Sequence, residues 1–417
     1  MRTPTPPVTE HSTASPAGGG LLFSIWSSQF GISVVYGAVP GVLLALQIEA
    51  LAGEGKVAAL SLFTLFGAIA ALIAQPLAGM LSDRTRTRFG SRTPYVLGGS
   101  AVVAPVLLAM GFTDSLILLG CLYLTSEFVL SAAQGPLAAT LPDRVPAARR
   151  GRFSAGLGLG IMLGSMGGTI LGSLLADDLR LAYITLSVVP LLLTMTRVFI
   201  ARDPDNRAVT SSPRNRGTRW WTTFLVNPKA HPDFWWAVGS RTLVYTGFFI
   251  VQGYGLYILG DYVGAGSDAV EYVGIAAAIA AVGICLTAVP AGLLSDRVGR
   301  RKPFIVGATV VMGAGLLVPL VAPTVTGYLA MIGIVGLAFG CFEAVDTALV
   351  TQVLPRSTSF AQDLGVTNVA AIAPQILAPA LAGAIVLTTG SFAVIFPTAT
   401  ALVIAGGLAV SRVRTVR

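Results

Sequence analysis

A short motif occurs twice in this chain, first as Gly79-Met80-Leu81-Ser82-Asp83-Arg84 and again as Gly292-Leu293-Leu294-Ser295-Asp296-Arg297. The two copies lie about half a chain length apart, and each falls between two long apolar segments. The dipeptide Leu141-Pro142 recurs at the same spacing as Leu354-Pro355. A membrane chain built from two related halves is typical of transporters that rock those halves around a central site.

Composition places the chain in a membrane. Of its 417 residues, 54% are hydrophobic and only 11% are charged, and a soluble chain of this kind would expose far too much apolar surface. Three cysteines, Cys121, Cys285 and Cys341, lie within apolar runs at no metal-ligand spacing, so we expect small core residues. We expect neither a cofactor nor a bound metal.

Twelve apolar segments can be counted, and most reach the roughly 20 residues that cross a bilayer as a helix. They span residues 22–46, 57–81, 94–112, 116–141, 153–176 and 181–200, then 234–259, 270–294, 303–322, 327–350, 364–388 and 392–410. The sequence therefore predicts an all-α membrane protein with twelve transmembrane helices in two pseudo-symmetric six-helix halves, at residues 21–200 and 234–411. Residues 1–20 and 412–417 are predicted tails, the first disordered, and residues 201–233 a flexible linker.

Basic residues lie almost entirely on one side of this arrangement. With the N-terminus in the cytoplasm, the cytoplasmic loops, linker and tails hold nearly all of the 27 lysines and arginines. Only Lys56 and Arg180 fall on the other side, and Arg241 falls inside a helix. The positive-inside rule thus predicts a multi-pass protein of the cell (inner) membrane with both termini cytoplasmic. The net charge of +8 follows from topology, so we expect the lipid bilayer as partner and no nucleic acid.

Six helices, a linker and six more helices resemble the major facilitator superfamily over essentially the whole chain. Its best-known signature is the Gly-x-Leu-Ser-Asp-Arg motif in the loop after the second helix. The resemblance implies that each motif aspartate contacts a helix start of the other half when the cytoplasmic side is closed. Helix N-termini attract carboxylates, and glycines let helices approach closely. The alternative is a set of basic loop residues that serves topology alone. We predict a cytoplasmic gate of Gly79, Asp83 and Arg84 facing Asp363, and of Gly292, Asp296 and Arg297 facing Arg152.

Further stretches narrow the resemblance. Glu127 lies seven residues before Gln134-Gly135-Pro136, the first helix holds Gln29-Phe30-Gly31, and the loop after the first motif ends Phe89-Gly90-Ser91-Arg92-Thr93-Pro94. With the start of the eleventh helix, these look like the sucrose-transporter branch of the glycoside-pentoside-hexuronide cation symporters. The resemblance implies a sugar or glycoside as the small-molecule substrate and a cation as the coupling ion.

Charged side chains inside transmembrane helices are the strongest candidates for a role in transport. They are costly in lipid, so they normally face a cavity or a partner. The candidates for proton coupling are Glu127 on the fourth helix, Arg241 on the seventh, and Glu343 and Asp346 on the tenth. Glu127 lies near the middle of its segment, where a carboxyl group is suited to bind and release a proton. The alternatives are a static pair with Arg241 or a hydrogen bond between helices. Glu343 and Asp346 share a helix face, and Arg241 is an obvious partner for both.

Uncharged polar side chains recur at helical spacing and are candidates to line a substrate cavity. Amides and aromatic rings suit a polyhydroxylated solute, although hydrogen bonding between helices is the alternative for each of them. The candidates are Gln29, Ser33, Tyr36, Gln134, Tyr245, Gln252, Asn368 and Gln375. The fifth helix is rich in glycine, which predicts tight packing against a neighbour.

Other functions fit less well. The sequence has no Gly-x-x-x-x-Gly-Lys loop for ATP, and its two histidines, His11 and His231, lie outside the predicted helices. We therefore predict no enzyme but a secondary active transporter that functions as a monomer by alternating access. Proton-coupled symport of a sugar or glycoside is favoured, with Na⁺ as the other coupling ion. The alternative is a proton-coupled exporter of a drug or secondary metabolite.

Overall fold

The computed structural model describes residues 18–146, 150–207, 231–353, 374 and 377–414. Regular structure in these residues is helical throughout. The first half contains the helices α1 Gly19–Ala38, η1 Val39–Leu43, α2 Leu44–Ala52, α3 Lys56–Arg84, α4 Thr93–Gly111, α5 Leu116–Arg144, α6 Arg150–Leu174 and α7 Leu179–Phe199. The second half contains α8 Pro232–Gln252, α9 Gly255–Tyr257, η5 Ile258–Tyr262, α10 Ala269–Val298, α11 Lys302–Leu316, α12 Val318–Val321, α13 Val325–Val353, Leu377–Thr389 and α15 Ile395–Ser411.

The described helices correspond to eleven of the twelve predicted segments and to part of the remaining one. Nine of the described stretches are long and apolar enough to cross a membrane, and α8 with its bent continuation makes a tenth. The continuous stretch Gly19–Arg84 contains the first two predicted segments, and Leu377–Thr389 is the described part of the eleventh. The earlier part of that eleventh segment, including Asn368, lies outside the described residues.

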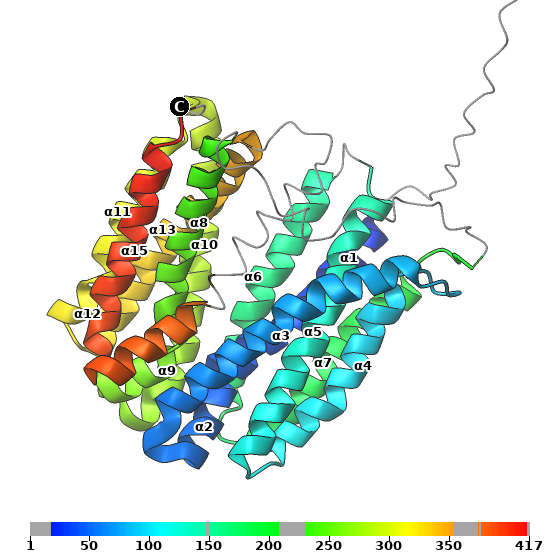
Figure 1. Cartoon of the computed structure of the whole chain (residues 1–417), viewed down its shortest axis with the longest axis horizontal. Coiled ribbons are helices and arrows are strands. Elements are labelled where there is room, and N and C mark those ends of the chain that lie inside the picture. Colours follow the sequence, from blue (N-terminus) through cyan, green and yellow to red (C-terminus); the bar gives the residue numbers. More distant parts are fainter. Residues whose placement is uncertain (1–17, 147–149, 208–230, 354–373, 375–376, 415–417) are drawn as a thin grey trace, which may run out of the picture.

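The helices form two groups that repeat the same packing. In Figure 1, α1 to α7 stand on one side and α8 to α15 on the other. In the first half, α4 packs against α5 and α7, while α1 packs against α7. The second half repeats these contacts, because α11 packs against α13 and α15, and α8 packs against α15. The doubled motif therefore corresponds to a doubled packing scheme.

The first and seventh predicted helices are broken at matching places. The first changes from α1 to a π-helical turn after Ala38, where Pro40 supplies no backbone N–H. The seventh ends α8 at Gln252 and bends by 51° before continuing as α9 and η5, with Gly253 at the break. The predicted seventh segment, residues 234–259, is therefore a bent span. Glycine weakens a helix interior, which explains the position of the second break.

Glycines bring α1 and α6 into backbone contact, as the glycine-rich fifth segment predicts. A Cβ added to Gly168 of α6 would overlap the carbonyl group of Val34 on α1. A Cβ added to Gly37 of α1 would overlap the carbonyl group of Ser165 on α6. The prediction of tight packing is confirmed, and only glycine fits these two positions.

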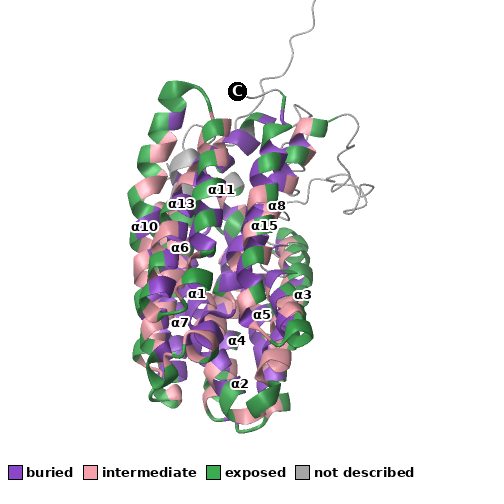
Figure 2. Ribbon diagram, turned by 90° about the vertical axis from the view of Figure 1, so that its left-hand side faces the viewer, coloured by how far each residue is buried: buried purple, intermediate pink, exposed green. Residues whose placement is uncertain are grey.

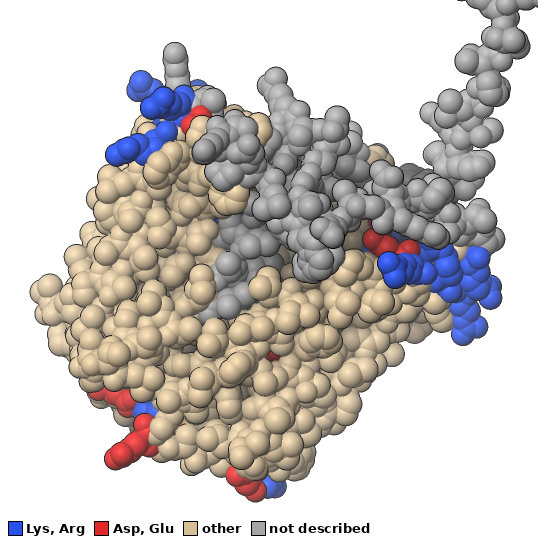
Figure 3. All heavy atoms as spheres, in the orientation of Figure 1, with Lys and Arg blue, Asp and Glu red and all other residues tan. Residues whose placement is uncertain are grey.

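The outer surface is apolar, with charge at its two ends. Buried residues follow the helix faces that turn toward each other, and exposed residues follow the outside (Figure 2). On the face seen in Figure 3, Lys and Arg gather at the end that carries the Ser-Asp-Arg motifs, called the motif end. Asp and Glu predominate at the opposite end, called the far end, and an uncharged belt lies between. Cys121 and Cys285 are exposed, so their expected place in the core was wrong; small apolar side chains also suit a lipid-facing surface.

The described polar contacts between the two halves lie at the far end. Lys56, at the start of α3, pairs with Asp261 of η5 at 2.9 Å. The hydroxyl group of Tyr257 on α9 donates to the carbonyl oxygen of Ala45 on α2 at 3.0 Å, and Ser61 of α3 bonds to Tyr254. Ser173 of α6 donates to the carbonyl oxygen of Val270 on α10. The halves are thus joined at the end away from the motifs.

Candidate functional site

The N-half cluster consists of Tyr36, Tyr123, Glu127 and Ser131. Glu127 lies near the middle of α5 and is only 8% exposed. Gly67 of α3 makes room for it, since a Cβ there would lie 2.8 Å from the Tyr123 ring and 3.1 Å from the Glu127 Cγ. Tyr123, one helical turn before Glu127, is its hydrogen-bonding partner.

No base pairs with Glu127 among the described residues. The nearby polar groups are neutral: the hydroxyl groups of Tyr36 on α1 and Ser131 on α5 are hydrogen-bonded at 2.8 Å. The alternative of a static pair with Arg241 is not what the structure shows, because Arg241 pairs in the other half. A carboxyl group held this way has no cation to offset its charge.

The C-half cluster consists of Arg241, Tyr245, Glu343, Asp346 and Thr347, where α8 meets α13. The Arg241 Nε lies 3.3 Å from Asp346 Oδ2, and its Nη2 lies 3.6 Å from Glu343 Oε1. The same Nη2 donates to the hydroxyl oxygens of Tyr245 and Thr347, each at 3.3 Å. The hydroxyl group of Tyr245 donates to the second carboxylate oxygen of Glu343. One arginine therefore holds both acids of the tenth segment.

The two acids of this cluster differ in their exposure. The side chain of Asp346 is completely buried, and neither of its carboxylate oxygens has a hydrogen bond with good geometry. The side chain of Glu343 is 39% exposed. Aromatic rings continue the wall beside it, with Phe339 stacked on Phe248 at 4.0 Å between ring centroids. Glu343 is thus the open acid and Asp346 the enclosed one.

The polar stripe residues fall in different places. Gln29 and Ser33 are buried where α1 packs against the glycines of α6, and Gln29 Nε2 donates to Ser33 Oγ at 3.1 Å. In this conformation the two residues are hydrogen-bonded to each other within α1 and are buried against α6. Gln134 is half-buried and Gln252 exposed. Asn368 and Gln375 lie outside the described residues.

At the motif end, Arg92 ties the first motif to α5. Its Nη2 lies 2.6 Å from Asp83 and 2.7 Å from Asp143, and its Nη1 donates to the hydroxyl group of Ser82. The side chain of Asp83 remains 62% exposed. Asp83 therefore pairs within its own half, whereas its predicted neighbour Asp363 lies outside the described residues.

The second motif repeats the ion pair between its aspartate and an arginine that follows it. Asp296 pairs with Arg301 at 3.1 Å, at the positions that match Asp83 and Arg92 in the repeat. Arg84 and Arg297 are exposed, and the side chain of Arg152 is not described. Among the described residues, the motif glycines make no close helix contact: a Cβ on Gly79 would meet no described atom within 4 Å, and one on Gly292 would lie an ordinary 3.8 Å from Ala344 Cβ. The close helix approach expected at these glycines stays a prediction.

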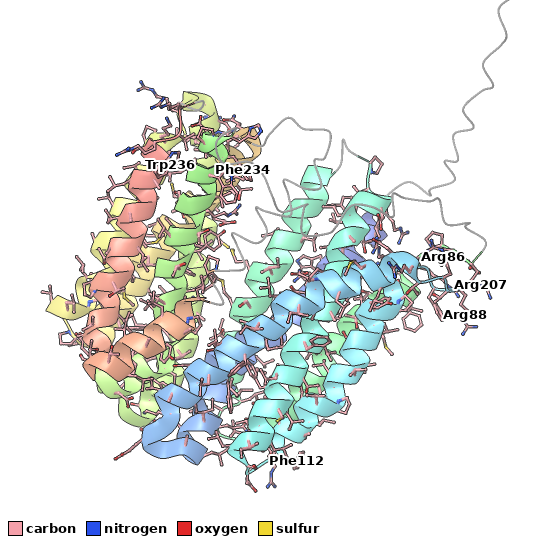
Figure 4. All side chains as sticks on the ribbon, in the orientation of Figure 1. Arg86, Arg88, Phe112, Arg207, Phe234 and Trp236 are labelled. Carbon is pink, nitrogen blue, oxygen red and sulfur yellow. The ribbon has the colours of Figure 1, made fainter. Side chains whose placement is uncertain are left out.

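The start of the linker is packed against the N-terminal half, so its prediction as flexible from residue 201 was wrong. Asp203 is 5% exposed and accepts hydrogen bonds from the backbone and hydroxyl groups of Thr93. It also pairs with Arg144 at 2.7 Å and with the fully buried Arg197 at 3.4 Å. Two residues later, hydrogen bonds from Arg207 hold the pKa of the exposed Asp205 below its usual value. Figure 4 shows Arg207 beside Arg86 and Arg88 at this end.

Comparison with known proteins identifies the fold. The sequence matches the model of the Major Facilitator Superfamily over residues 21–265 and 259–417. The chain belongs to this superfamily. A bacterial homolog to the human lysosomal transporter Spinster, solved in an inward-facing and unoccupied conformation, is 14% identical, with 94% of each chain covered and a TM-score of 0.64. An aspartate-to-alanine mutant of the nucleoside transporter NupG is 14% identical, with 94% of this chain and 99% of that chain covered and a TM-score of 0.70.

Membership of the Major Facilitator Superfamily confirms the predicted fold class and the prediction of a membrane transporter rather than an enzyme. Superfamily members carry small-molecule substrates. At this identity the two solved structures show the fold alone, so the substrate and coupling ion must be argued from the residues of this chain.

Sequence reasoning missed several residues that hold the site. Gly67 and Tyr123 were not singled out, although Tyr123 lies one turn from Glu127. Asp203 was read as linker, yet Arg197 inside the preceding predicted helix signals the need for a carboxylate. Lys56 was noted only as one of two bases on the far side, and nothing local marks it as a contact between halves.

Proposed function

We propose that this transporter carries a sugar, glycoside or similar small polar solute into the cell together with a proton. We place it as a monomer in the cell (inner) membrane with both termini cytoplasmic, as the charge distribution of Figure 3 supports. The observation that carries the proposal is Glu127, a buried acid in the middle of α5 with no base as partner among the described residues.

An unpaired carboxylate inside a membrane is costly, and binding a proton removes that cost. Glu127 is therefore favoured as the residue that loads and releases the coupling proton. The C-half cluster is the second candidate, because Asp346 is enclosed and, within the described ranges, its one partner is Arg241. Glu343, which shares Arg241 with Asp346, completes the coupling residues.

Alternating access is supported by the placement of contacts between the halves. At the far end, polar contacts such as Lys56 with Asp261 cross between the halves. At the motif end, each motif aspartate pairs within its own half. This favours a conformation closed at the far end. In the other conformation we propose that Asp83 meets the eleventh helix near Asp363, and Asp296 meets the fifth near Arg152.

A sugar or glycoside as solute is supported by the wall of the C-half cluster. The stacked rings of Phe248 and Phe339 offer an apolar face, and Tyr245 and Glu343 offer hydrogen-bonding groups beside it. Tyr36 and Gln134 supply further polar groups from the N-terminal half.

One experiment tests the proposal. The purified protein is reconstituted in proteoliposomes and offered a broad glycoside panel with and without an imposed pH gradient. We expect gradient-driven accumulation of a glycoside, and alkalinisation of the external medium when that glycoside is added without a gradient. Acidification on adding lipophilic drugs, or no response to the whole glycoside panel, would instead support the exporter.

A further inference from the structure

The charges inside the membrane do not balance. Away from the helix ends, the sequence places three acids and one base there: Glu127, Glu343, Asp346 and Arg241. The undescribed start of the eleventh segment adds none, since residues 364–373 contain no charged side chain. With every group ionised, the interior carries an excess of two negative charges.

The single base is already engaged. Arg241 contacts Asp346 through its Nε and reaches Glu343, Tyr245 and Thr347 through its Nη2. An anionic solute that sought Arg241 would have to displace Glu343 and leave that carboxylate without its cation. Displacing one partner of such a pair leaves an uncompensated charge, which is the costly outcome.

Glu343 is the acid that an arriving solute meets, because its side chain is the more exposed of the two in the C-half cluster. Behind it, Asp346 is completely buried, and among the described residues its carboxylate has only the ion pair with Arg241 and no hydrogen bond of good geometry. In the other half, Glu127 adds a second buried acid, which pairs with no base in the part of the chain that the structure describes. Carboxylates in a low-dielectric surrounding raise the local concentration of cations and lower that of anions.

We propose that the transported solute is neutral or positively charged and that Glu343 excludes solutes bearing a carboxylate or phosphate group. This inference rests on the proposed function, since it narrows the substrate class of the same site. Neutral sugars and amino sugars would then be transported, whereas uronates and sugar phosphates would be excluded.

The first test probes the electrostatic potential at the C-half cluster with charged thiol reagents, so the identity of the solute need not be known. The three native cysteines are replaced by alanine, and a reporter thiol is introduced as Thr347→Cys, on the exposed residue that contacts Arg241. Its reaction rates with a cationic and an anionic methanethiosulfonate of similar size are measured in detergent. Thr389→Cys, at an exposed far-end position remote from both clusters, gives the control ratio.

We expect the ratio of cationic to anionic rate at Thr347→Cys to exceed the control ratio at least about tenfold. When Glu343→Gln is combined with Thr347→Cys, the ratio of cationic to anionic rate should fall several-fold toward the ratio at the control position. A ratio at Thr347→Cys equal to or below the control would overturn the proposal. So would a thiol there that the cationic reagent fails to reach while the control position reacts.

The second test uses solutes on one ring skeleton: glucose, glucosamine and glucuronate in proteoliposomes. We expect glucose or glucosamine to enter at least about tenfold faster than glucuronate, and Glu343→Gln to narrow that difference. Glucuronate uptake as fast as glucose uptake would contradict the proposal. If none of the three enters, the glycoside assignment has failed, while the thiol ratio still decides the charge of the site.

Discussion

Lys56 joins the two halves at the far end, and its removal should shift the conformational equilibrium. Its Nζ lies 2.6 Å from Glu49 of its own half, 2.9 Å from Asp261 of the other half, and 4.8 Å from the centre of the Tyr257 ring. Opening the far end breaks the contacts with Asp261 and Tyr257 and keeps the one with Glu49. Lys56→Gln therefore removes two interactions that favour the closed far end, while its loss of the Glu49 contact affects both conformations alike.

The exposure of the partner side chain sets the free energy that the Lys56 contacts contribute. The side chain of Asp261 is 39% exposed, so its pair with Lys56 is worth about 0.2–1 kcal/mol. The cation–π contact with Tyr257 adds roughly 0.5–1 kcal/mol. Together they give about 0.7–2 kcal/mol, and about 1.4 kcal/mol changes a population ratio tenfold. Lys56→Gln should thus raise the far-end-open population roughly 3- to 30-fold.

The assay is a distance distribution between spin labels at Glu54→Cys and Ser267→Cys, two exposed far-end positions on opposite halves. Arg180→Gln is the matched control, because this other far-side base lies over the Phe112 ring of its own half at 5.4 Å. We expect Lys56→Gln to add a longer distance and Arg180→Gln to add none. An unchanged distribution in Lys56→Gln, or an equal shift in both variants, would refute the reasoning.

Three further predictions concern packing, the linker and the gate. Gly168→Val forces a side chain into the carbonyl group of Val34, so we expect loss of monodisperse protein in size-exclusion chromatography. Asp203→Asn leaves the buried Arg197 without its counter-charge, at a cost of about 3–5 kcal/mol, and should lower the melting temperature of the solubilised protein by several degrees. Asp83→Asn should weaken the proposed inward-closed state by about 0.3–1 kcal/mol and speed the labelling of a cysteine placed at Ser359.

Each of these predictions has a matched control. Gly158→Val places its side chain where a Cβ meets no atom within 4 Å, so it should leave the protein monodisperse. Asp205→Asn removes an exposed pair with Arg207 and should change the melting temperature little. Asp143→Asn weakens the same Arg92 contact as Asp83→Asn but removes no predicted gate contact, so labelling should stay unchanged. Equal effects in a variant and its control would contradict the corresponding prediction.

The fold could be predicted because it depends on patterns that act over short distances. The repeat of Ser82-Asp83-Arg84 as Ser295-Asp296-Arg297 and the lengths of the apolar segments indicate two related halves. The partners of Arg241 could also be anticipated, because Glu343 and Asp346 share a helix face and few charges lie inside the membrane.

The remaining features depend on contacts that no local pattern reveals. The pairing of Lys56 with Asp261 joins residues 205 positions apart, and it depends on how the two halves are placed relative to each other. Asp203 lies in a stretch whose composition is typical of linkers. Its burial depends on where Arg144 and Thr93 of other helices lie. Gln29 and Ser33 have the spacing of a cavity stripe, but the glycines of α6 cover that face of α1. The sequence shows which residues are polar, and packing decides what each one faces.

The role of Glu127 as carrier of the coupling proton can be measured directly. The measurement compares Glu127→Gln with the unmodified protein in proteoliposomes loaded with the transported solute. Glu271→Gln, which alters an exposed acid at the far end of α10, is the control. We predict that Glu127→Gln abolishes accumulation driven by a pH gradient and retains exchange of solute across the membrane, while Glu271→Gln retains both. Full pH-driven accumulation by Glu127→Gln would contradict the account.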